Sequence, residues 1–481
     1  MSAPKTSPRT RWQVIRKSLS LPAAFGVAVG VGLLLHKHVG ATREASFMGG
    51  IFVLAAVLWV TEALPLFATS LLVIGLQIIF LSNPGGWHGL GFEQEPSPTF
   101  RELLSVAADP VLVLFFGGFV LAHAAVKTGV DRAMSSVLLR PFGGEPRWLL
   151  LGVMLVTLLF GMWMSNTATT AMMLALVTPL LAALPPGEPF RKALVLGVPF
   201  AANISGMATP ISSPPNAVAM GFLQKSGYSI PFFDWMLMAA PFTIGLTLIA
   251  WFLLWRSFKP VTPGLKLAMT QGKLSREGWV VVVVFVVTVG LWMTDVWHGL
   301  PASVVALLPA VVLTVTTIFT RADLAQLEWN VLILIAGGIS LGTGMQLTGL
   351  DRVIVGWLPS PEQNDLILLI VLVSATLVVG TFMSNTAAAN LFLPIGLSST
   401  MVGGGASGLH PVHVAVSIAL VASMSMALPV STPPNAMAYA RGEFTTREMV
   451  RVSLFISLGG MMLILLGAGF LLRVFGLMPV H

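Results

Sequence analysis

Apolar stretches close to the length of a membrane-spanning helix alternate along the whole chain with short polar segments. A transmembrane helix needs about 20 predominantly apolar residues. Apolar runs of this order begin near Leu21, Phe47, Leu64, Val111, Leu149, Ala193, Trp235, Trp279, Pro301, Val331, Leu366, Val412 and Val450. This pattern predicts an all-α polytopic membrane protein.

Basic residues gather in two segments that flank apolar runs: a tail, residues 1–20, and a linker, residues 259–276. Both are expected in the cytoplasm, because basic residues mark cytoplasmic segments. The tail is expected to stay on the protein, since no clear cleavage site follows it. Seven apolar runs separate the two segments, although an even number of crossings is required. Either one run enters and leaves on the same side, or the count is wrong by one.

Four motifs occur twice, in the same order. Those that begin at Gly117, Thr128, Met164 and Ser213 recur at Gly337, Thr348, Met383 and Thr432, 219 or 220 residues later. The chain therefore has two homologous halves, residues 21–258 and residues 277–481. If each half crosses the membrane an odd number of times, the halves are inverted. Transporters often use this plan, with the substrate at the midplane between the repeats.

The first repeated polar interruption is Ser-Asn-Thr, at residues 165–167 and 384–386. Each copy separates two apolar arms of about 17 residues, roughly 25 Å of helix. We therefore predict two re-entrant hairpins, residues 148–184 and 365–400, with their tips near the bilayer centre. The start of the second arm suits an anion, whereas Ser and Asn oxygens suit an alkali cation. A helix cap in an ordinary loop is the alternative, which the duplication disfavours.

The second repeated interruption is Pro-Pro-Asn, at residues 214–216 and 433–435. Two prolines remove two N–H donors, so the helix unwinds and upstream carbonyls lose their partners. Irregular backbone at membrane depth is tolerated where it lines a cavity or is buried in protein. We predict broken helices at residues 191–223 and 411–441, with carbonyls free to bind a cation. An ordinary proline kink or surface loop is the alternative.

Composition excludes several classes of protein and several kinds of site. Only 9% of residues are charged and 56% are hydrophobic, which excludes a soluble enzyme and a disordered chain. There is no Cys, so disulfides and thiolate metal sites are excluded. No catalytic motif and no organic cofactor site is recognised, and the net charge of +7 reflects the basic tail and linker, so no nucleic-acid partner is expected. Since the four interruptions contain no Lys, Arg or His, bound cations would balance the charge of an anion.

Two titratable residues in apolar runs are weaker candidates. Glu62 is a membrane-embedded acid, but its place at the end of a run favours a helix cap or scaffold contact. His123 could relay protons. Its repeat counterpart is Thr343, so the repeat gives no support, and a packed histidine is favoured.

The paired Ser-Asn-Thr and Pro-Pro-Asn motifs, with the segment from Trp59 to Pro65, resemble the divalent anion–sodium symporters over nearly the whole chain. This is the solute carrier family 13-like group of di- and tricarboxylate transporters. The resemblance implies eleven transmembrane helices, two re-entrant hairpins and an inverted two-fold repeat. It also implies a homodimer in the inner cell membrane that works as an elevator. The N-terminus would lie in the cytoplasm and the C-terminus outside.

The resemblance also implies site residues. One Na⁺ site would use Gly161, Ser165, Asn166 and the Ser212 backbone. A second would use Gly380, the Met383 carbonyl, Asn385 and the Ser431 backbone. The substrate would meet Asn166, Thr167, Ser213, Pro214, Asn385, Thr386, Thr432 and Pro433.

One departure from the family concerns Gly161 and Gly380. Relatives carry Ser or Thr four residues before the Ser-Asn-Thr serine, but this chain has glycine in both halves. A backbone carbonyl survives that change and a hydroxyl does not. The predicted function is Na⁺-coupled transport of a small dianion, a C4-dicarboxylate such as succinate, malate or fumarate. The alternatives are a Na⁺-independent dicarboxylate exchanger and a sulfate or citrate transporter of the same fold. A channel or an inert membrane scaffold is disfavoured by the paired helix breaks.

Overall fold

The computed structural model describes residues 8–92, 97–143, 145–261, 274–357, 365–401 and 409–477. Every regular element within these ranges is helical. Seven helical segments are long and apolar enough to cross a membrane, and six shorter apolar helices accompany them. The predicted all-helical polytopic architecture is therefore present. Residues 1–7 and 262–273 of the predicted tail and linker lie outside the described ranges. The cytoplasmic placement of both segments stays a prediction.

The helices of the two halves follow one another in the same order. The first half contains α1 (Pro8–Leu34), α2 (Arg43–Thr61), α3 (Leu66–Gln77), α4 (Phe100–Leu104), α5 (Pro110–Thr128), α6 (Val130–Leu139), α7 (Pro146–Gly161), α8 (Asn166–Ala182), α9 (Pro189–Ser205), α10 (Pro214–Lys225) and α11 (Phe232–Ser257). The second contains α12 (Arg276–Met293), α13 (Asp295–His298), α14 (Ala302–Val305), α15 (Leu307–Val315), α16 (Arg321–Ala325), α17 (Trp329–Thr348), α18 (Leu350–Val355), α19 (Asp365–Phe382), α20 (Asn385–Met401), α21 (Pro411–Ala422), α22 (Pro433–Tyr439) and α23 (Thr446–Val474). Helices α5–α11 thus correspond in order to α17–α23.

The helices break where the polar motifs predict. In the first half, α7 ends at Gly161 and α8 begins at Asn166, directly after Ser165. The arm α9 ends at Ser205, and α10 begins at Pro214. Proline suits the first position of a helix because its missing N–H would have no intrahelical partner there. The second half repeats both breaks, between α19 and α20 and between α21 and α22.

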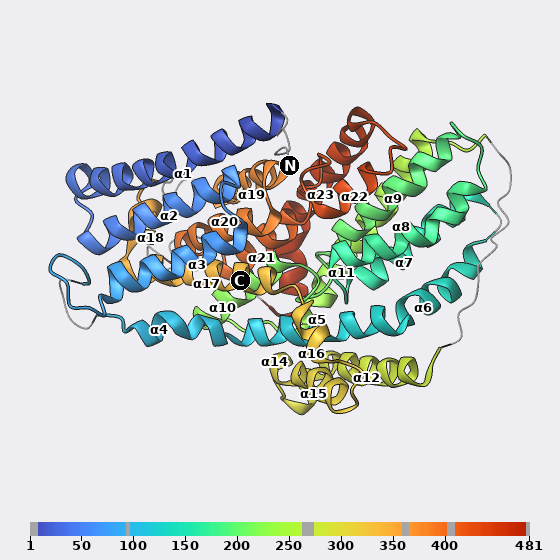
Figure 1. Cartoon of the computed structure of the whole chain (residues 1–481), viewed down its shortest axis with the longest axis horizontal. Helices are drawn as coiled ribbons and strands as arrows, with labels where there is room; N and C mark the ends of the chain where they lie inside the picture. The colour runs from blue at the N-terminus through green and yellow to red at the C-terminus, as the bar shows by residue number, and fades with distance from the viewer. Residues whose placement is uncertain are drawn as a thin grey trace, which may run out of the picture.

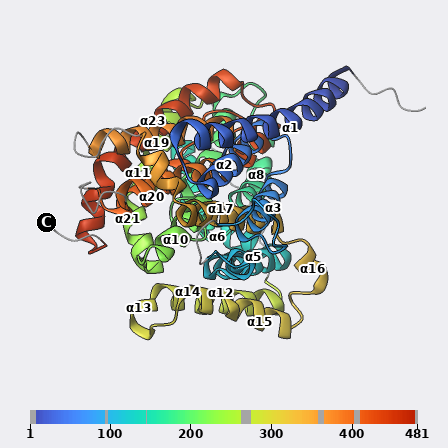
Figure 2. The same ribbon diagram turned by 90° about the vertical axis from the view of Figure 1, so that its left-hand side faces the viewer.

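The two halves interlock. The first-half helix α3 packs against α17, whereas the second-half helices α14 and α15 pack against α5. Likewise α10 contacts α20 and α21, and α22 contacts α8 and α9. Figures 1 and 2 show α12, α14 and α15 as a layer outside α5, away from α1 and α2. Figure 1 shows α7 and α8 on the right, while α19 and α20 lie towards the centre and left. Each hairpin is therefore surrounded by helices from both halves.

Two glycines allow close approaches between helices of the two halves. A Cβ atom on Gly117 of α5 would lie 2.0 Å from the carbonyl oxygen of Ala306, at the junction of α14 and α15. A Cβ atom on Gly337 of α17 would lie 2.2 Å from the Cβ of Ser70 on α3. Small residues let helix backbones approach closely in membranes. The repeated Gly-Gly motif is therefore a packing device between the halves.

Ion pairs join the start of α9 to the segment around the start of α23. The Arg191 guanidinium donates to both carboxylate oxygens of Glu443, and it also donates to the carbonyls of Leu181 and Leu184. The Lys192 ammonium pairs with Glu448 at 2.6 Å. A two-pronged Arg–carboxylate contact adds geometric specificity to the attraction. These pairs tie the end of the first hairpin to the second half.

Large apolar side chains remain exposed along several helices. Those of α23 include Phe455, Leu466 and Phe470, which are 65%, 76% and 67% exposed. Contiguous exposed apolar surface is expected where lipid takes the place of water. Glu62 is exposed in a left-handed conformation at the end of α2, so its helix-end position agrees with the expectation.

Candidate functional site

The tip of the first hairpin is organised by Ser165. Its Oγ caps α8 by accepting the backbone N–H of Ala168 at 3.3 Å. The same hydroxyl donates to Oε1 of Glu328 at 2.7 Å. Glu328 directly precedes α17, so this contact joins the hairpin tip to the second half of the chain. A carboxylate therefore stands beside a predicted cation ligand.

The asparagines at the two tips have amide oxygens without partners. Among the described residues, Oδ1 of Asn166 and Oδ1 of Asn385 are buried and accept no hydrogen bond. Buried polar atoms are nearly always paired in folded proteins. Two repeat-related amide oxygens, one at each tip, are therefore without a hydrogen-bond partner among the described residues.

Each tip is tied to the broken helix of its own half. In the first half, Oγ1 of Thr209 donates to the carbonyl of Met162 at 2.7 Å. In the second half, Oγ of Ser431 donates to the carbonyl of Thr381 at 2.6 Å. A Cβ atom on Gly206 would lie 3.0 Å from Nδ2 of Asn166, so this amide abuts the break after α9. Tip and break therefore form one site.

The Asn of each Pro-Pro-Asn motif closes the unwound loop. Nδ2 of Asn216 donates to the carbonyls of Gly206 and Thr209, at 2.8 Å each. Nδ2 of Asn435 donates in the same way to the carbonyls of Met426 and Leu428, at 2.9 Å each. The expectation that the break leaves its carbonyls free is wrong for these four. A side-chain amide replaces the helical N–H donors that proline removed.

The two repeats meet directly through a buried amide pair. Nδ2 of Asn203 on α9 donates to Oδ1 of Asn435 on α22 at 2.9 Å. The two residues are 1% and 0% exposed. A hydrogen bond between halves, 232 positions apart in sequence, therefore lies beside both unwound segments.

The other predicted site residues lie around these breaks. Thr167 and Thr386 stand in the first turns of α8 and α20, half-buried and buried respectively. Ser213 and Thr432 are the buried residues before α10 and α22. Pro214 is half-buried, whereas Pro433 is exposed. Gly161, Ser212, Gly380 and Met383 are themselves buried. The roles of all of them stay predictions.

Sequence reasoning missed two acids near the first tip. Glu328, Ser165, Ala168 and His123 contribute to a cavity of about 160 Å³. Asp109, which caps α5, precedes Glu328 by 219 positions, so the repeat offset could have indicated Glu328.

The second missed acid is Asp323, which holds His123. Nε2 of His123 lies 3.1 Å from one Asp323 oxygen, and the Lys127 ammonium lies 2.6 Å from the other. Burial alone would raise the pKa of Asp323, but hydrogen bonds from its neighbours, above all Lys127, hold that pKa below its usual range. Asp323 therefore stays ionised at neutral pH. The stability that the ionised Asp323 carboxylate adds to the folded protein would be lost as the pH falls through this lowered pKa.

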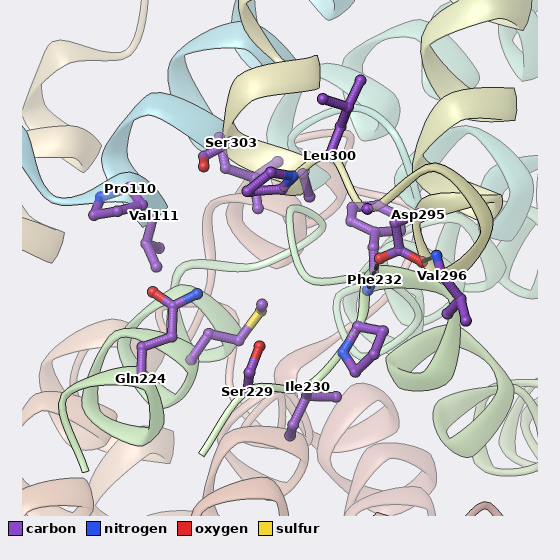
Figure 3. A pocket seen from close by; sticks show the side chains of 16 residues that line it. Pro110, Val111, Gln224, Ser229, Ile230, Phe232, Asp295, Val296, Leu300 and Ser303 are labelled. Carbon is purple, nitrogen blue, oxygen red and sulfur yellow. Dashed lines mark hydrogen bonds between the residues drawn. The ribbon is translucent and has the colours of Figure 1, made fainter. Parts of the chain in front are cut away.

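A separate cavity of about 290 Å³ lies at the far end of α10 (Figure 3). Its polar groups include Gln224, Ser229, Ser303 and Asp295, whose carboxylate accepts the backbone N–H of Phe232 at 2.8 Å. None of the 16 lining residues is a predicted site residue. This cavity is therefore distinct from the site at the tips.

The set of oxygen atoms at the tips fits a hard monovalent cation. It consists of neutral hydroxyl, amide and carbonyl oxygens, which alkali cations accept. The described residues contain no group of three His, Cys, Asp or Glu side chains that could hold a metal ion. Neutral oxygens of this kind suit an alkali cation better than a transition metal.

Comparison with known proteins identifies the kind of molecule. The sequence profile of a family described as citrate transporter matches residues 56–420. The "Inorganic phosphate transporter PHO87" of Saccharomyces cerevisiae is 32% identical over 84% of this chain and 44% of the relative. The "Sodium-dependent dicarboxylate transporter SdcS" of Staphylococcus aureus is 29% identical over 87% of this chain and 85% of the relative. The chain spans about half the length of its yeast relatives.

The fold also has a solved counterpart. The YdaH transporter of Alcanivorax borkumensis superposes with a TM-score of 0.55 at 15% identity, over 86% of this chain and 98% of that one. At this identity the likeness concerns the fold alone. The matched proteins are transporters and not enzymes. The resemblance to divalent anion–sodium symporters is confirmed, and the chain belongs to the citrate transporter family of multi-pass membrane transporters.

Proposed function

We propose that this transporter carries a small dianion, a C4-dicarboxylate, across the inner membrane in symport with Na⁺. The observation that carries the proposal is the pair of buried, unpartnered amide oxygens on Asn166 and Asn385. Each stands at the start of a helix, where backbone N–H groups and the helix dipole favour an anion. Two such tips suit the two carboxylates of one substrate.

One amide side chain can couple the two ions. Its Oδ1 offers lone pairs to a cation, while its Nδ2 can donate to a carboxylate. A cation on Oδ1 polarises the amide and strengthens donation from Nδ2. Binding of Na⁺ and of the anion thereby become mutually favourable, and each lowers the cost of desolvating the other. Thr167 and Thr386 would add hydroxyl donors, with Ser213, Pro214, Thr432 and Pro433 beside the substrate.

The cation ligands follow the same two-fold plan. The first site would use Ser165, Asn166 and backbone oxygens at Gly161 and Ser212. The second would use Asn385 and backbone oxygens at Gly380, Met383 and Ser431. A dicarboxylate carries two negative charges at pH 7, since free carboxyl pKa values lie near 4. Two Na⁺ ions would leave a neutral complex for an elevator movement of the transport domain in a homodimer.

The helix order supports six crossings before the linker. They are α1, α2, α3, α5, α9 with α10, and α11, whereas the α7–α8 hairpin re-enters. An even number places the tail and the linker on the same side, which we take to be the cytoplasm. Five further crossings would place the C-terminus outside.

The names of the relatives support an anionic substrate and leave other anions as alternatives to a dicarboxylate. SdcS is named as a sodium-dependent dicarboxylate transporter and matches nearly its whole length. PHO87 is named as an inorganic phosphate transporter, and the family profile is described as citrate transporter. Phosphate and citrate are therefore the alternative anions, and a Na⁺-independent exchanger is the alternative mechanism.

The proposal predicts Na⁺-driven uptake of labelled succinate into proteoliposomes that contain the purified protein. An inward Na⁺ gradient is expected to drive uptake, and a K⁺ gradient is not. Excess malate or fumarate should compete, whereas sulfate should not. A parallel set preloaded with unlabelled succinate provides the control for exchange. Uptake that needs preloading and ignores Na⁺ would overturn symport, and competition by phosphate or citrate alone would overturn the dicarboxylate.

Glu328 gives a second prediction, because its carboxylate accepts the Ser165 hydroxyl at 2.7 Å. Glu328→Gln keeps an acceptor oxygen and removes a negative charge beside the first cation site. At about 1 kcal/mol or more per charge pair at this range, half-saturation by Na⁺ should need about fivefold more Na⁺ or higher. The measurement is the Na⁺ dependence of uptake in proteoliposomes.

The matched control for this variant is Glu145→Gln. Glu145 is exposed and pairs with Arg147 at the far end of α7, so its loss should leave the Na⁺ dependence unchanged. An unchanged Na⁺ dependence in Glu328→Gln would show that the carboxylate has no part in cation binding.

A further inference from the structure

The two glycines that depart from the family pattern each face a serine at or just after the end of α9 or α21. A Cβ atom on Gly161 would lie 2.0 Å from Oγ and 2.8 Å from Cβ of Ser205. A Cβ atom on Gly380 would lie 2.5 Å from Oγ and 2.9 Å from Cβ of Ser425. The volume that a side chain at either glycine would occupy therefore already holds a hydroxyl.

The arrangement is similar in both halves. Ser205 and Ser425 are 220 positions apart, one more than the 219 that separates Gly161 from Gly380, so they occupy neighbouring positions of the repeat. Ser205 is the last residue of α9, and Ser425 follows the end of α21 by three positions, so both stand where a broken helix unwinds. Both are 0% exposed. A chance packing contact would have no reason to recur at both tips.

The hydroxyls retain acceptor capacity. Oγ of Ser205 donates to the carbonyl of Ala202 at 2.6 Å, and Oγ of Ser425 donates to the carbonyl of Leu377 at 3.2 Å. A serine hydroxyl that donates its hydrogen in this way still has oxygen lone pairs that can bind a cation. Gly206, the neighbour of Ser205, lies against the Asn166 amide, whose Oδ1 has no hydrogen-bond partner among the described residues.

We propose that the hydroxyl oxygens of Ser205 and Ser425 are ligands of the two coupling cations. This inference rests on the proposed Na⁺ coupling. The family pattern has a hydroxyl on the hairpin arm, at positions 161 and 380. In this chain the hydroxyl would come instead from the segment that faces the arm, and glycine on the arm leaves room for it. Na⁺ coupling is then compatible with Gly161 and Gly380.

The first test measures Na⁺ binding without transport. Purified wild-type protein in detergent is titrated with Na⁺ at constant ionic strength, with choline as the replacement. The readouts are the unfolding temperature and equilibrium binding of ²²Na⁺. Ser205→Ala and Ser425→Ala should each weaken Na⁺ binding by about tenfold, and the double variant should lose it. Their unfolding temperatures in choline should match that of the wild type, because alanine fits the space of serine.

Ser399→Ala is the matched control. Ser399 is 1% exposed, and its Oγ donates to the carbonyl three positions earlier at 2.6 Å, as that of Ser205 does. It lies near the far end of α20, away from the tip. Na⁺ binding by this variant should equal that of the wild type.

The second test returns the hydroxyl to the hairpin arm. Gly161→Ser alone should lower the unfolding temperature in choline, since its Cβ would overlap the Ser205 hydroxyl. Ser205→Gly alone should weaken Na⁺ binding by about tenfold, as Ser205→Ala does. The double variant Gly161→Ser with Ser205→Gly removes the overlap and restores one hydroxyl, so it should regain Na⁺ binding.

The outcomes separate the two proposals. A wild type that shows neither ²²Na⁺ binding nor Na⁺-dependent stabilisation would overturn Na⁺ coupling itself, and the serine assignment with it. A wild type that binds Na⁺, together with Ser205→Ala and Ser425→Ala variants that bind it equally well, would overturn only the serine assignment. Failure of the relocated hydroxyl to restore binding that Ser205→Gly has lost would also count against it.

Discussion

Alanine in place of Asn166 or Asn385 is expected to abolish Na⁺-driven uptake, while the protein still inserts and folds. Each amide is proposed to bind a cation through Oδ1 and the substrate through Nδ2. One hydrogen bond to a charged group contributes about 1.5–3 kcal/mol, and two such interactions are lost together. Initial uptake at fixed Na⁺ and succinate should therefore fall by at least about 100-fold.

The effect should be symmetric between the tips, because both Oδ1 atoms lack partners among the described residues. Asn330→Ala is the control, since Asn330 is exposed on α17 and should transport as the wild type does. Size-exclusion profiles and unfolding temperatures confirm that the variants fold. Normal transport by either Asn166→Ala or Asn385→Ala would remove that residue from the site.

Valine at Gly117 or Gly337 is expected to prevent assembly of the fold. The new Cβ at Gly117 would lie 2.0 Å from a backbone oxygen of Ala306, and that at Gly337 would lie 2.2 Å from the Cβ of Ser70. A backbone atom cannot rotate away as a side-chain terminus can, so α5 and α14 would have to separate. Overpacking costs about 1–3 kcal/mol where side chains can adjust, and more where they cannot. The measurement is the yield of monodisperse protein in detergent and its unfolding temperature.

Gly245→Val in α11 provides the control for this pair. A Cβ atom at Gly245 would meet no atom within 4 Å, so this variant should be obtained in normal yield. Gly117→Val and Gly337→Val should behave alike, because each closes the same kind of interface in its own repeat. A stable, monodisperse Gly117→Val protein would mean that α5 and α14 can separate enough to hold a valine side chain between them.

Most of the helix plan could be predicted from local pattern. The length of an apolar run identifies a helix, and Ser165 or two prolines identify its end, because capping and proline geometry act within a few residues. The repeat offset then assigns the same plan to the second half. The prediction that the first break leaves its carbonyls free was wrong for Gly206 and Thr209. Pattern shows that proline removes donors, but it does not show that a side-chain amide two turns away replaces them.

Contacts between distant segments could not be predicted from pattern. Ser165 meets Glu328 across 163 positions, and Asn203 meets Asn435 across 232. A glycine at position 161 looks like the loss of a ligand until Ser205 is seen in the space beside it.

The sequence by itself determined an all-helical membrane transporter with two related halves, two hairpin tips and two broken helices. These features follow from hydrophobic length, backbone chemistry and an internal repeat, all of which are local or periodic. Only the tertiary structure decided which oxygens are left unpartnered, which carboxylate stands beside Ser165 and which hydroxyls occupy the space beside Gly161 and Gly380. The physical reason is that an oxygen's partners depend on the packing of helices from both halves, and many sequences with the same hydrophobic pattern would pack with different partners.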